Sequence, residues 1–154
     1  KNFGMNVACF RAGCITGPNH SGAELHGFLS YLVKSCIQKK KYKLIGYKGK
    51  QVRDNIHSYD LTNAFWCYYK KPVKDALFNI GGSRYSNCSI LEAINYVERK
   101  LGISVKKTNI KRPRVGDHQW YISDISKFKK AYPSYKLKYN TEKILDEIIE
   151  AVDS

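Results

Sequence analysis

Arginine and aspartate occur together at two places in this sequence where they could bind one ligand. Arg53 stands in "KGKQVRDNIHSYD", residues 48–60, and the second place is "RPRVGD", residues 112–117, which contains Arg114 and Asp117. A guanidinium group binds phosphate through a fork of two hydrogen bonds, and a carboxylate accepts hydrogen bonds from ribose hydroxyls. A proline and a glycine in the second segment favour a turn that directs both charged side chains the same way. Taken alone, that segment is more typical of an exposed basic loop.

The strand predicted within residues 48–60 has one apolar face, interrupted by an aspartate, and one wholly polar face. The two faces consist of Val52, Asp54 and Ile56, and of Gln51, Arg53, Asn55 and His57. Periodicity alone favours an edge strand with a solvated polar face. The alternative is a polar face that lines a cleft, where Arg53 would bind a phosphate or a carboxylate. Asp54 lies on the apolar side, so we expect it to make a structural hydrogen bond.

The elements that must position these residues alternate between strands and helices. Apolar runs predict strands at 5–10, 42–47 and 76–82, and amphipathic patterns predict helices over about 22–38 and 89–102. This alternation predicts an α/β fold. The first and third runs are typical of parallel strands covered on both faces, but two such strands make a poor sheet. We therefore expect them to belong to a larger sheet whose other strands are not in this chain.

Two helix starts carry recognisable capping residues. Ser21 and Glu24 have the spacing of a capping box, which places the start of the long helix near residue 22. Asp60 is positioned to cap the helix that follows the charged strand.

The net charge of the chain limits the classes of partner. The 154 residues are expected to form one domain, and 27 Lys and Arg against 13 Asp and Glu give a net charge of +14. Such an excess attracts nucleic acid, anionic membranes or nucleotide phosphates. The basic residues are scattered, and no glycine-rich aromatic motif of the RNA-binding type is present. The sequence thus argues against nucleic acid, while a non-enzymatic basic α/β module for RNA or an acidic partner stays open.

Cysteine and histidine spacing argues against metal sites and disulfides. The five cysteines are odd in number without a C-x-x-C pair, and the four histidines are dispersed. A reducing, cytoplasmic compartment follows most simply. No apolar run approaches the roughly 20 residues that span a bilayer, so we expect no membrane partner. The first residue is Lys rather than Met, and we expect the chain to begin inside a longer protein.

Four segments of the chain match motifs of a known superfamily in their order. They are "FRAGCITGP" at 10–18, "YKLIGYKGKQVRDNIHSYDL" at 42–61, "LFNIGG" at 77–82 and "KRPRVGDHQWYISDISKFKK" at 111–130. Together they resemble the C-terminal half of the extended short-chain dehydrogenase/reductases, which include NAD-dependent nucleotide-sugar epimerases and 4,6-dehydratases. Each motif alone is weak, whereas their order and spacing are specific and cover nearly the whole chain. Within that superfamily, residues 13–34 and 46–66 look most like the CDP-paratose 2-epimerases, also called CDP-tyvelose epimerases.

The resemblance implies roles for individual residues. Arg53 and Arg114 would hold the diphosphate of a nucleotide sugar, Asp117 would hold the ribose, and the strand at 43–45 would flank the base. The implied substrate contacts are Arg53, Arg114, Asp117, Cys14, Glu24, Leu25, Lys43, Leu44 and Ile45, and the implied cofactor contacts are Ala12 and Gly13, near the nicotinamide of NAD. Generic epimerases carry Asn at the position of Cys14, so contacts to the sugar should differ there.

The same resemblance implies that the chemistry belongs to another part of the enzyme. In the superfamily, a glycine-rich fingerprint and a Tyr-x-x-x-Lys pair lie in the N-terminal half, and no tyrosine here has the expected setting. We therefore expect no catalytic residue in this chain, and no epimerase activity from it alone. Residues 1–154 would be the nucleotide-sugar-binding portion, with about 1–20 and 76–102 belonging to an incomplete Rossmann domain.

The resemblance leaves the substrate and assembly partly open. The closest likeness implies a CDP-sugar, and the alternatives are epimerases or dehydratases that use UDP- or dTDP-sugars. The full-length enzyme would form a homodimer or homo-oligomer, as is common in the superfamily.

Overall fold

Three short sheets and five α-helices make up the part of the chain that the structure describes. The computed structural model describes residues 4–24 and 26–153. The helices are α1 (Phe28–Ile37), α2 (Ser58–Lys70), α3 (Ile90–Leu101), α4 (Ser126–Ala131) and α5 (Thr141–Asp153), with a 3-10 turn η1 (Tyr47–Gly49). The strands are β1 (Ala8–Ala12), β2 (Cys14–Thr16), β3 (Tyr42–Ile45), β4 (Val52–His57), β5 (Ala76–Ile80), β6 (Asn87–Ser89), β7 (Lys107–Ile110) and β8 (Trp120–Tyr121).

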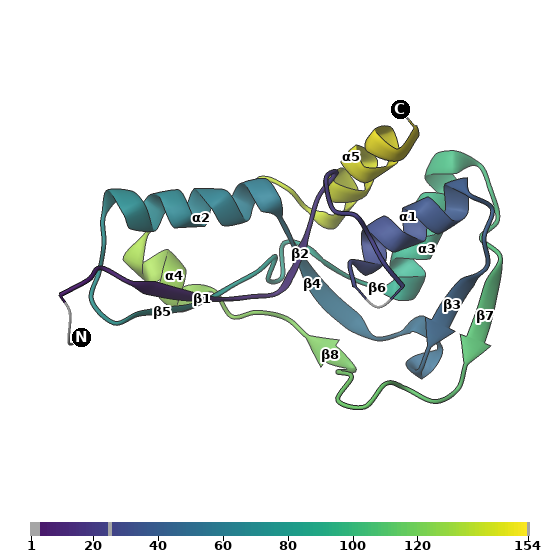
Figure 1. The fold of residues 1–154 in the computed structure, drawn as a ribbon, viewed down its shortest axis with the longest axis horizontal. Coiled ribbons are helices and arrows are strands. Elements are labelled where there is room, and N and C mark those ends of the chain that lie inside the picture. Colours follow the sequence, from purple (N-terminus) through teal and green to yellow (C-terminus); the bar gives the residue numbers. More distant parts are fainter. Residues whose placement is uncertain (1–3, 25, 154) are drawn as a thin grey trace.

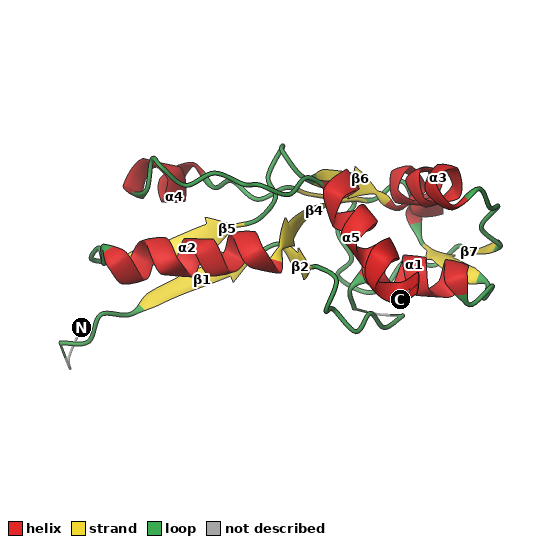
Figure 2. Cartoon of the chain, turned by 90° about the horizontal axis from the view of Figure 1, so that it is seen from above, coloured by secondary structure: helices red, strands yellow, loops and turns green. Residues whose placement is uncertain are grey.

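The molecule is elongated, with one apolar cluster toward each end and the sheet around β4 between them (Figure 1). At the end nearer the N-terminus, β1 and β5 pair in parallel. α2 and α4 both run alongside this pair of strands (Figure 2). The ring of Phe10 contacts Phe65 of α2, and Phe10 and Phe78 both contact Phe128 of α4, which is fully buried. The opposite face of the pair is open, since Leu77 is 43% exposed. The expectation that both faces are covered therefore does not hold within this chain.

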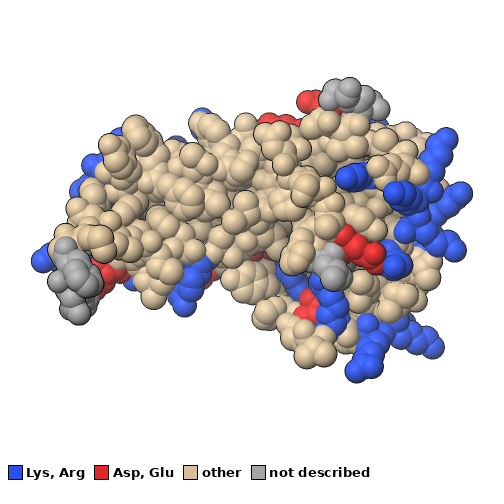
Figure 3. Space-filling model, in the orientation of Figure 1, with Lys and Arg blue, Asp and Glu red and all other residues tan. Residues whose placement is uncertain are grey.

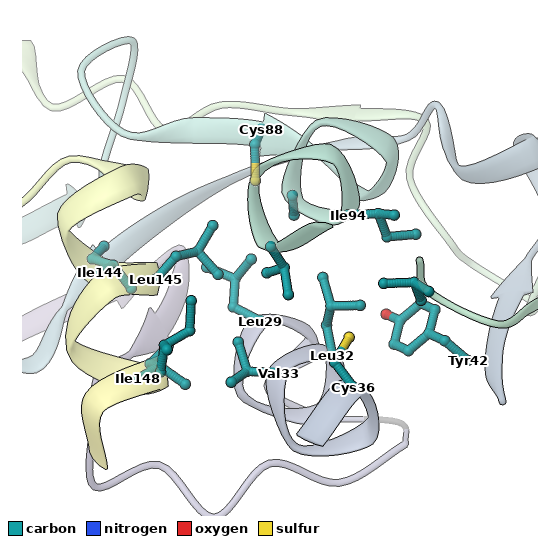
Figure 4. Close-up of a cluster of buried hydrophobic side chains, with 14 of the residues drawn as sticks. Leu29, Leu32, Val33, Cys36, Tyr42, Cys88, Ile94, Ile144, Leu145 and Ile148 are labelled. Carbon is teal, nitrogen blue, oxygen red and sulfur yellow. The ribbon is translucent and has the colours of Figure 1, made fainter. Parts of the chain in front are cut away.

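The second cluster joins three helices to β3. Leu32, Val33, Ile94 and Ile148 from α1, α3 and α5 are at most 1% exposed, and they point toward one another (Figure 4). β3 contributes Leu44 and pairs in parallel with β7. Of the residues 76–102 that were grouped with 1–20, β5 pairs with β1 while α3 packs against α1, and their common membership of an incomplete Rossmann domain stays a prediction.

β4 lies at the centre of the middle sheet and is not an edge strand. Its second half pairs with β2 in parallel, and its first half pairs with β6 on one side and β8 on the other. All of its residues except the partly exposed Arg53 are buried. The edge-strand interpretation is wrong because three segments from distant parts of the chain cover a strand whose own sequence shows one polar face.

The long helix begins later than its capping-box spacing indicates. α1 starts at Phe28 after Gly27, whose φ of 68° is left-handed, and Gly22 has a φ of 55°. Between these glycines a tight turn pairs Ala23 with His26. Glycine adopts left-handed angles at little cost, so the two positions interrupt the predicted first turns. Glu24 consequently belongs to a loop.

Of two other helix starts, that of α2 is capped by a residue other than the predicted one, and that of α3 lies where it was predicted. The start of α2 is capped by His57, whose Nδ1 accepts from the backbone N–H of Tyr59 at 3.0 Å. Asp60 instead accepts hydrogen bonds from the backbone N–H groups of Lys138 and Tyr139, so its carboxylate ties α2 to the segment before α5. The predicted helix over 89–102 is confirmed as α3, with a complete capping box at its start and left-handed Gly102 at its end.

Candidate functional site

A pocket of about 340 Å³ lies where β2, β3 and β4 meet the loop before α1. Its size is within the usual range of small-molecule sites. The wall combines basic, polar and apolar side chains. They are Cys14, Ile15, Thr16, His20, Glu24, His26, Gly27, Phe28, Leu29, Tyr42, Lys43, Ile45, Gln51, Arg53, Asn55, Ile90 and Arg114.

The two arginines of the pocket meet at one carboxylate. Asp117 Oδ1 lies 2.6 Å from Arg53 Nη2 and 3.5 Å from Arg114 Nη2. Arg53 also donates from Nη1 to its neighbouring carbonyl, Val52 O, at 2.8 Å. The side chains of Arg53 and Asp117 are only 15% and 6% exposed, so the pair is largely shielded from water. This holds the guanidinium of Arg53 in a fixed direction at the pocket wall.

The loop that carries Arg114 is held against β3 by close backbone packing. Gly46 follows β3 directly with a φ of 67°, and a Cβ there would come within 2.7 Å of Pro113 Cβ. Gly116 has a φ of 75°, and the Asp117 N–H donates to Arg114 O at 3.1 Å, which closes the predicted turn. The turn therefore directs its arginine and its aspartate to the same place.

A second ion pair stands on the more exposed side of the pocket. Lys43 Nζ is 2.8 Å from Glu24 Oε1, and the two side chains are 53% and 38% exposed. The hydrogen bond and the charge of Glu24 raise the pKa of Lys43. Lys43 thus stays cationic and adds a third positive charge to the two arginines, although Glu24 offsets part of it.

Cys14 lies at the other end of the pocket, on β2. Burial, with the nearby charge of Asp54, raises its pKa against the opposing effect of Arg53 and Arg114. The thiol is therefore protonated near neutral pH, and a protonated thiol is a poor nucleophile. Its partner in the strand register is Asn55 of β4.

The rear face of β4 carries Asp54, which has a structural role. Its Oδ2 accepts from the backbone N–H groups of Ser83, at 3.0 Å, and Ser123, at 3.1 Å. Gly13 packs so closely that a Cβ there would lie 2.5 Å from Asp54 Oδ1. The carboxylate joins β4 to two loops and is fully buried, as expected for a structural hydrogen-bond acceptor.

Comparison with known proteins assigns the chain to a family. The sequence profile of the NAD dependent epimerase/dehydratase family matches residues 1–81, which is more than half of the chain. The chain belongs to this family. CDP-paratose 2-epimerase of Salmonella typhi is 26% identical over 153 residues, covering 94% of this chain and 45% of that protein. UDP-glucose 4-epimerase of Mycoplasma genitalium is 24% identical over 161 residues, covering 96% and 46%. The chain thus spans about half the length of these relatives.

Solved structures of such epimerases have the same fold. UDP-glucuronic acid 4-epimerase from Bacillus cereus, in complex with UDP-glucuronic acid and NAD, matches with a TM-score of 0.83 and 24% identity over 99% of this chain and 46% of its own. UDP-glucose 4-epimerase from Thermus thermophilus, in complex with NAD, gives a TM-score of 0.85 at 15% identity, covering 99% and 48%. The α/β fold and the membership of the epimerase/dehydratase family are therefore confirmed.

The pocket brings together most of the residues that the resemblance singled out. Cys14, Glu24, Lys43, Ile45, Arg53 and Arg114 line it, and Asp117 contacts both arginines. Leu44 does not line it, because alternation along β3 turns its side chain into the core, where it is 3% exposed. Ala12 and Gly13 lie outside the pocket wall, so their place beside a cofactor stays a prediction. Leu25 lies outside the described residues.

Five polar residues of the pocket were not among the predicted contacts: Thr16, His20, His26, Gln51 and Asn55. Gln51, just before β4, and Asn55, on β4, line the pocket with Arg53, and both are at most 5% exposed. Gln51 Oε1 and Asn55 Oδ1 are buried and have no hydrogen-bond partner within residues 4–24 and 26–153. The alternation of the strand predicted that these side chains share one face. It could not predict that a deep pocket lies in front of them.

Of the three Tyr-x-x-x-Lys spacings in the sequence, only Tyr96 to Lys100 lies wholly within a helix, α3, and it matches the catalytic pair of the family in sequence only. Tyr96 donates to Asp146 Oδ1 at 2.9 Å, and Lys100 Nζ is 2.9 Å from the same atom, so both side chains attach α3 to α5. Burial and the hydrogen bond to Asp146 raise the pKa of Tyr96 to about 12. A group that exchanges protons near neutral pH needs a lower value. This pair is therefore structural.

The described part of the chain offers no metal site. Within it, no cluster of three His, Cys, Asp or Glu side chains could hold a metal ion. No helix among these residues has both the length and the apolar character needed to cross a membrane. All five cysteines are free.

Proposed function

We propose that this chain is the nucleotide-sugar-binding portion of an NAD-dependent epimerase that acts on a CDP-sugar, of the CDP-paratose 2-epimerase type. The carrying observation is the convergence of Arg53, Arg114 and Lys43 around a pocket with a polar floor. Two guanidinium groups and an ammonium match the charge of a diphosphate. The ligands named for the Bacillus cereus neighbour, UDP-glucuronic acid and NAD, are of the same chemical class.

The contacts of Asp117 suggest how the site would rearrange when the ligand binds. Its Oδ1 accepts from Arg53, and its Oδ2 is buried without a partner in the described part of the chain. A diphosphate would compete for both arginines, and the carboxylate could then accept from ribose hydroxyls, the role that the family resemblance implies.

Gln51 favours cytidine over uridine. Its Nε2 donates to Ile45 O at 3.0 Å, beside the strand expected to flank the base, which leaves Oε1 as a hydrogen-bond acceptor at the pocket wall. The exocyclic amino group of cytosine is a donor, whereas the corresponding oxygen of uracil is an acceptor that would leave Gln51 Oε1 unpaired. A site that hydrogen-bonds one group rejects the analogue that lacks it.

The chain fits only the edge of a dinucleotide site. Ala12 and Gly13 are small residues at the carboxyl end of the parallel strand β1, where α/β sheets bind ligands, but the sequence has no glycine-rich fingerprint. NAD would accept a hydride from the sugar and return it to the opposite face. The residues of this chain would bind and orient the sugar nucleotide, and we expect no turnover and no tight NAD binding from the 154 residues alone.

Titration calorimetry of the 154-residue chain with CDP, UDP and dTDP tests the proposal. We expect all three diphosphates to bind, CDP most tightly, with weaker binding as salt is raised. A UDP or dTDP preference would instead support the alternative sugar nucleotides. Absence of binding by every diphosphate would refute the proposed function.

A basic surface at one end of the molecule is the feature that an alternative function, non-enzymatic RNA binding, would use. Lys and Arg side chains gather at the end formed by β3, β7 and the C-terminal end of α1 (Figure 3). The exposed ones there include Lys39, Lys40, Lys41, Lys106 and Lys107. A module that follows an RNA backbone would use this end and show a steep salt dependence. RNA binding tighter than CDP binding at physiological salt would favour that alternative.

A further inference from the structure

Asn55 is a pocket residue to which the family motifs assign no role. It is fully buried in the centre of β4, yet it lines the pocket. Its Nδ2 donates to Arg53 O at 3.2 Å and lies 3.6 Å from Cys88 Sγ. Its Oδ1 is buried and has no partner among the residues that the structure describes. A buried polar atom without a partner is costly, so this oxygen requires an explanation.

The surroundings of this oxygen indicate what kind of group it would bind. The amide nitrogen of Asn55 is already engaged, so the free end of the side chain is a hydrogen-bond acceptor. An acceptor repels phosphate oxygens and attracts hydroxyl groups. Its register partner Cys14 remains a neutral thiol, because burial raises its pKa. Thr16, on the same face of β2 as Cys14, also has a buried hydroxyl without a partner in the described residues. This end of the pocket is polar but uncharged.

The position of Asn55 on β4 identifies which part of the ligand would reach it. Gln51, Arg53 and Asn55 lie on one face, and alternate residues of a strand are about 7 Å apart. Gln51 donates a hydrogen bond to Ile45 of β3, the strand expected to flank the base. Arg53, in the middle, and Arg114 form the diphosphate clamp, that is, the two arginines proposed to bind the diphosphate. Asn55 lies on the far side of that clamp. In a nucleoside diphosphate sugar, the group beyond the diphosphate is the sugar.

We propose that Asn55 Oδ1 accepts a hydrogen bond from a hydroxyl of the bound sugar, which makes Asn55 a specificity-determining residue. The inference rests on the proposed nucleotide-sugar function and extends it to the sugar. It places recognition of the sugar on an amide of β4, across the strand pair from Cys14. The site would discriminate against a ligand that has no hydroxyl in this position, because the amide oxygen would remain unpaired.

Calorimetric titrations with CDP and with CDP-glucose separate this inference from the proposed function. For the unchanged chain, we expect CDP-glucose to bind more tightly than CDP. For Asn55→Leu, which has a similar shape without polar atoms, we expect that advantage to fall roughly tenfold while the CDP affinity stays within about twofold. Asn55→Ser, whose hydroxyl is too short to reach the same point, should show the same loss if the leucine variant does not fold.

Asn87→Leu is the matched control. Asn87 lies on β6, beside β4, and its amide also donates to backbone carbonyls, but it does not line the pocket. We expect the CDP-glucose advantage to be retained in this variant. An unchanged advantage in a folded Asn55 variant, or equal losses for CDP and CDP-glucose, would overturn the role of Asn55 while leaving the nucleotide site intact. Failure of CDP itself to bind the unchanged chain would reject both proposals.

Discussion

Asp54 and Arg53 are neighbours on β4, yet their side chains serve different regions of the molecule. Asp54 faces the rear, where it accepts from the backbone of two loops and touches Gly13. Arg53 faces the pocket, where its charge is held by Asp117 from a distant loop. One face of the strand thus joins segments of the fold, while the other presents polar groups that a ligand can use. Substitutions on the two faces should therefore change different measured quantities.

Asp54→Ala should have the largest effect, and that effect should be on stability. Removing a fully buried carboxylate that accepts two charge-assisted hydrogen bonds should lower the free energy of unfolding by about 3–5 kcal/mol. Urea denaturation followed by circular dichroism measures this. Asp124→Ala is the control, because Asp124 is exposed and accepts one backbone hydrogen bond, from Ser126. Equal losses in the two variants would show that the rear face of β4 has no special structural role.

Arg53→Ala should change ligand affinity more than stability. We expect it to weaken CDP-sugar binding by roughly 1.5–3 kcal/mol, the scale of a charged hydrogen bond, because the central cation of the clamp is removed. Calorimetry at low salt measures the dissociation constant. Arg84→Ala, at an exposed position outside the pocket wall, should leave it unchanged. An unaltered dissociation constant for Arg53→Ala would remove this residue from the site.

Gln51→Leu should affect which base is bound. Loss of one neutral hydrogen bond should reduce the preference for CDP over UDP by about 1 kcal/mol, mainly through weaker CDP binding. The measurement is the ratio of the two dissociation constants in the variant and in the unchanged chain. If both affinities decrease equally, Gln51 supports the pocket wall through Ile45 and does not recognise the base.

Glu92→Ala, away from both faces of β4, should give the smallest effect. Hydrogen bonds from Ser89 in the capping box lower the pKa of Glu92 below its usual 4.5. A lowered pKa contributes stability above about pH 4.5, and this contribution disappears as the pH falls through the lowered value. We expect a loss of about 0.5 kcal/mol at pH 7 that shrinks by pH 3. Urea denaturation at both pH values measures it, and a loss that grows toward acid would contradict the assignment.

The sequence predicted local features where one element contains the whole signal. The helix predicted over 89–102 depends on one short stretch of chain, and the structure confirms it as α3, which ends at the left-handed Gly102. The start of α1 was predicted wrongly from the capping-box spacing of Ser21 and Glu24. There, two left-handed glycines interrupt the helix, and Glu24 forms an ion pair with Lys43 on another strand.

The sequence by itself determined the family, the α/β class and the polar face of β4, because motif order and side-chain alternation are properties of the chain alone. Only the tertiary structure decided that β4 is a central strand and that its polar face lines a pocket. β2, β6 and β8 pair with β4. The carboxylate of Asp117, which lies 64 positions after Arg53 in the sequence, contacts the guanidinium of Arg53. Such contacts depend on how distant segments pack, and local periodicity carries no information about them.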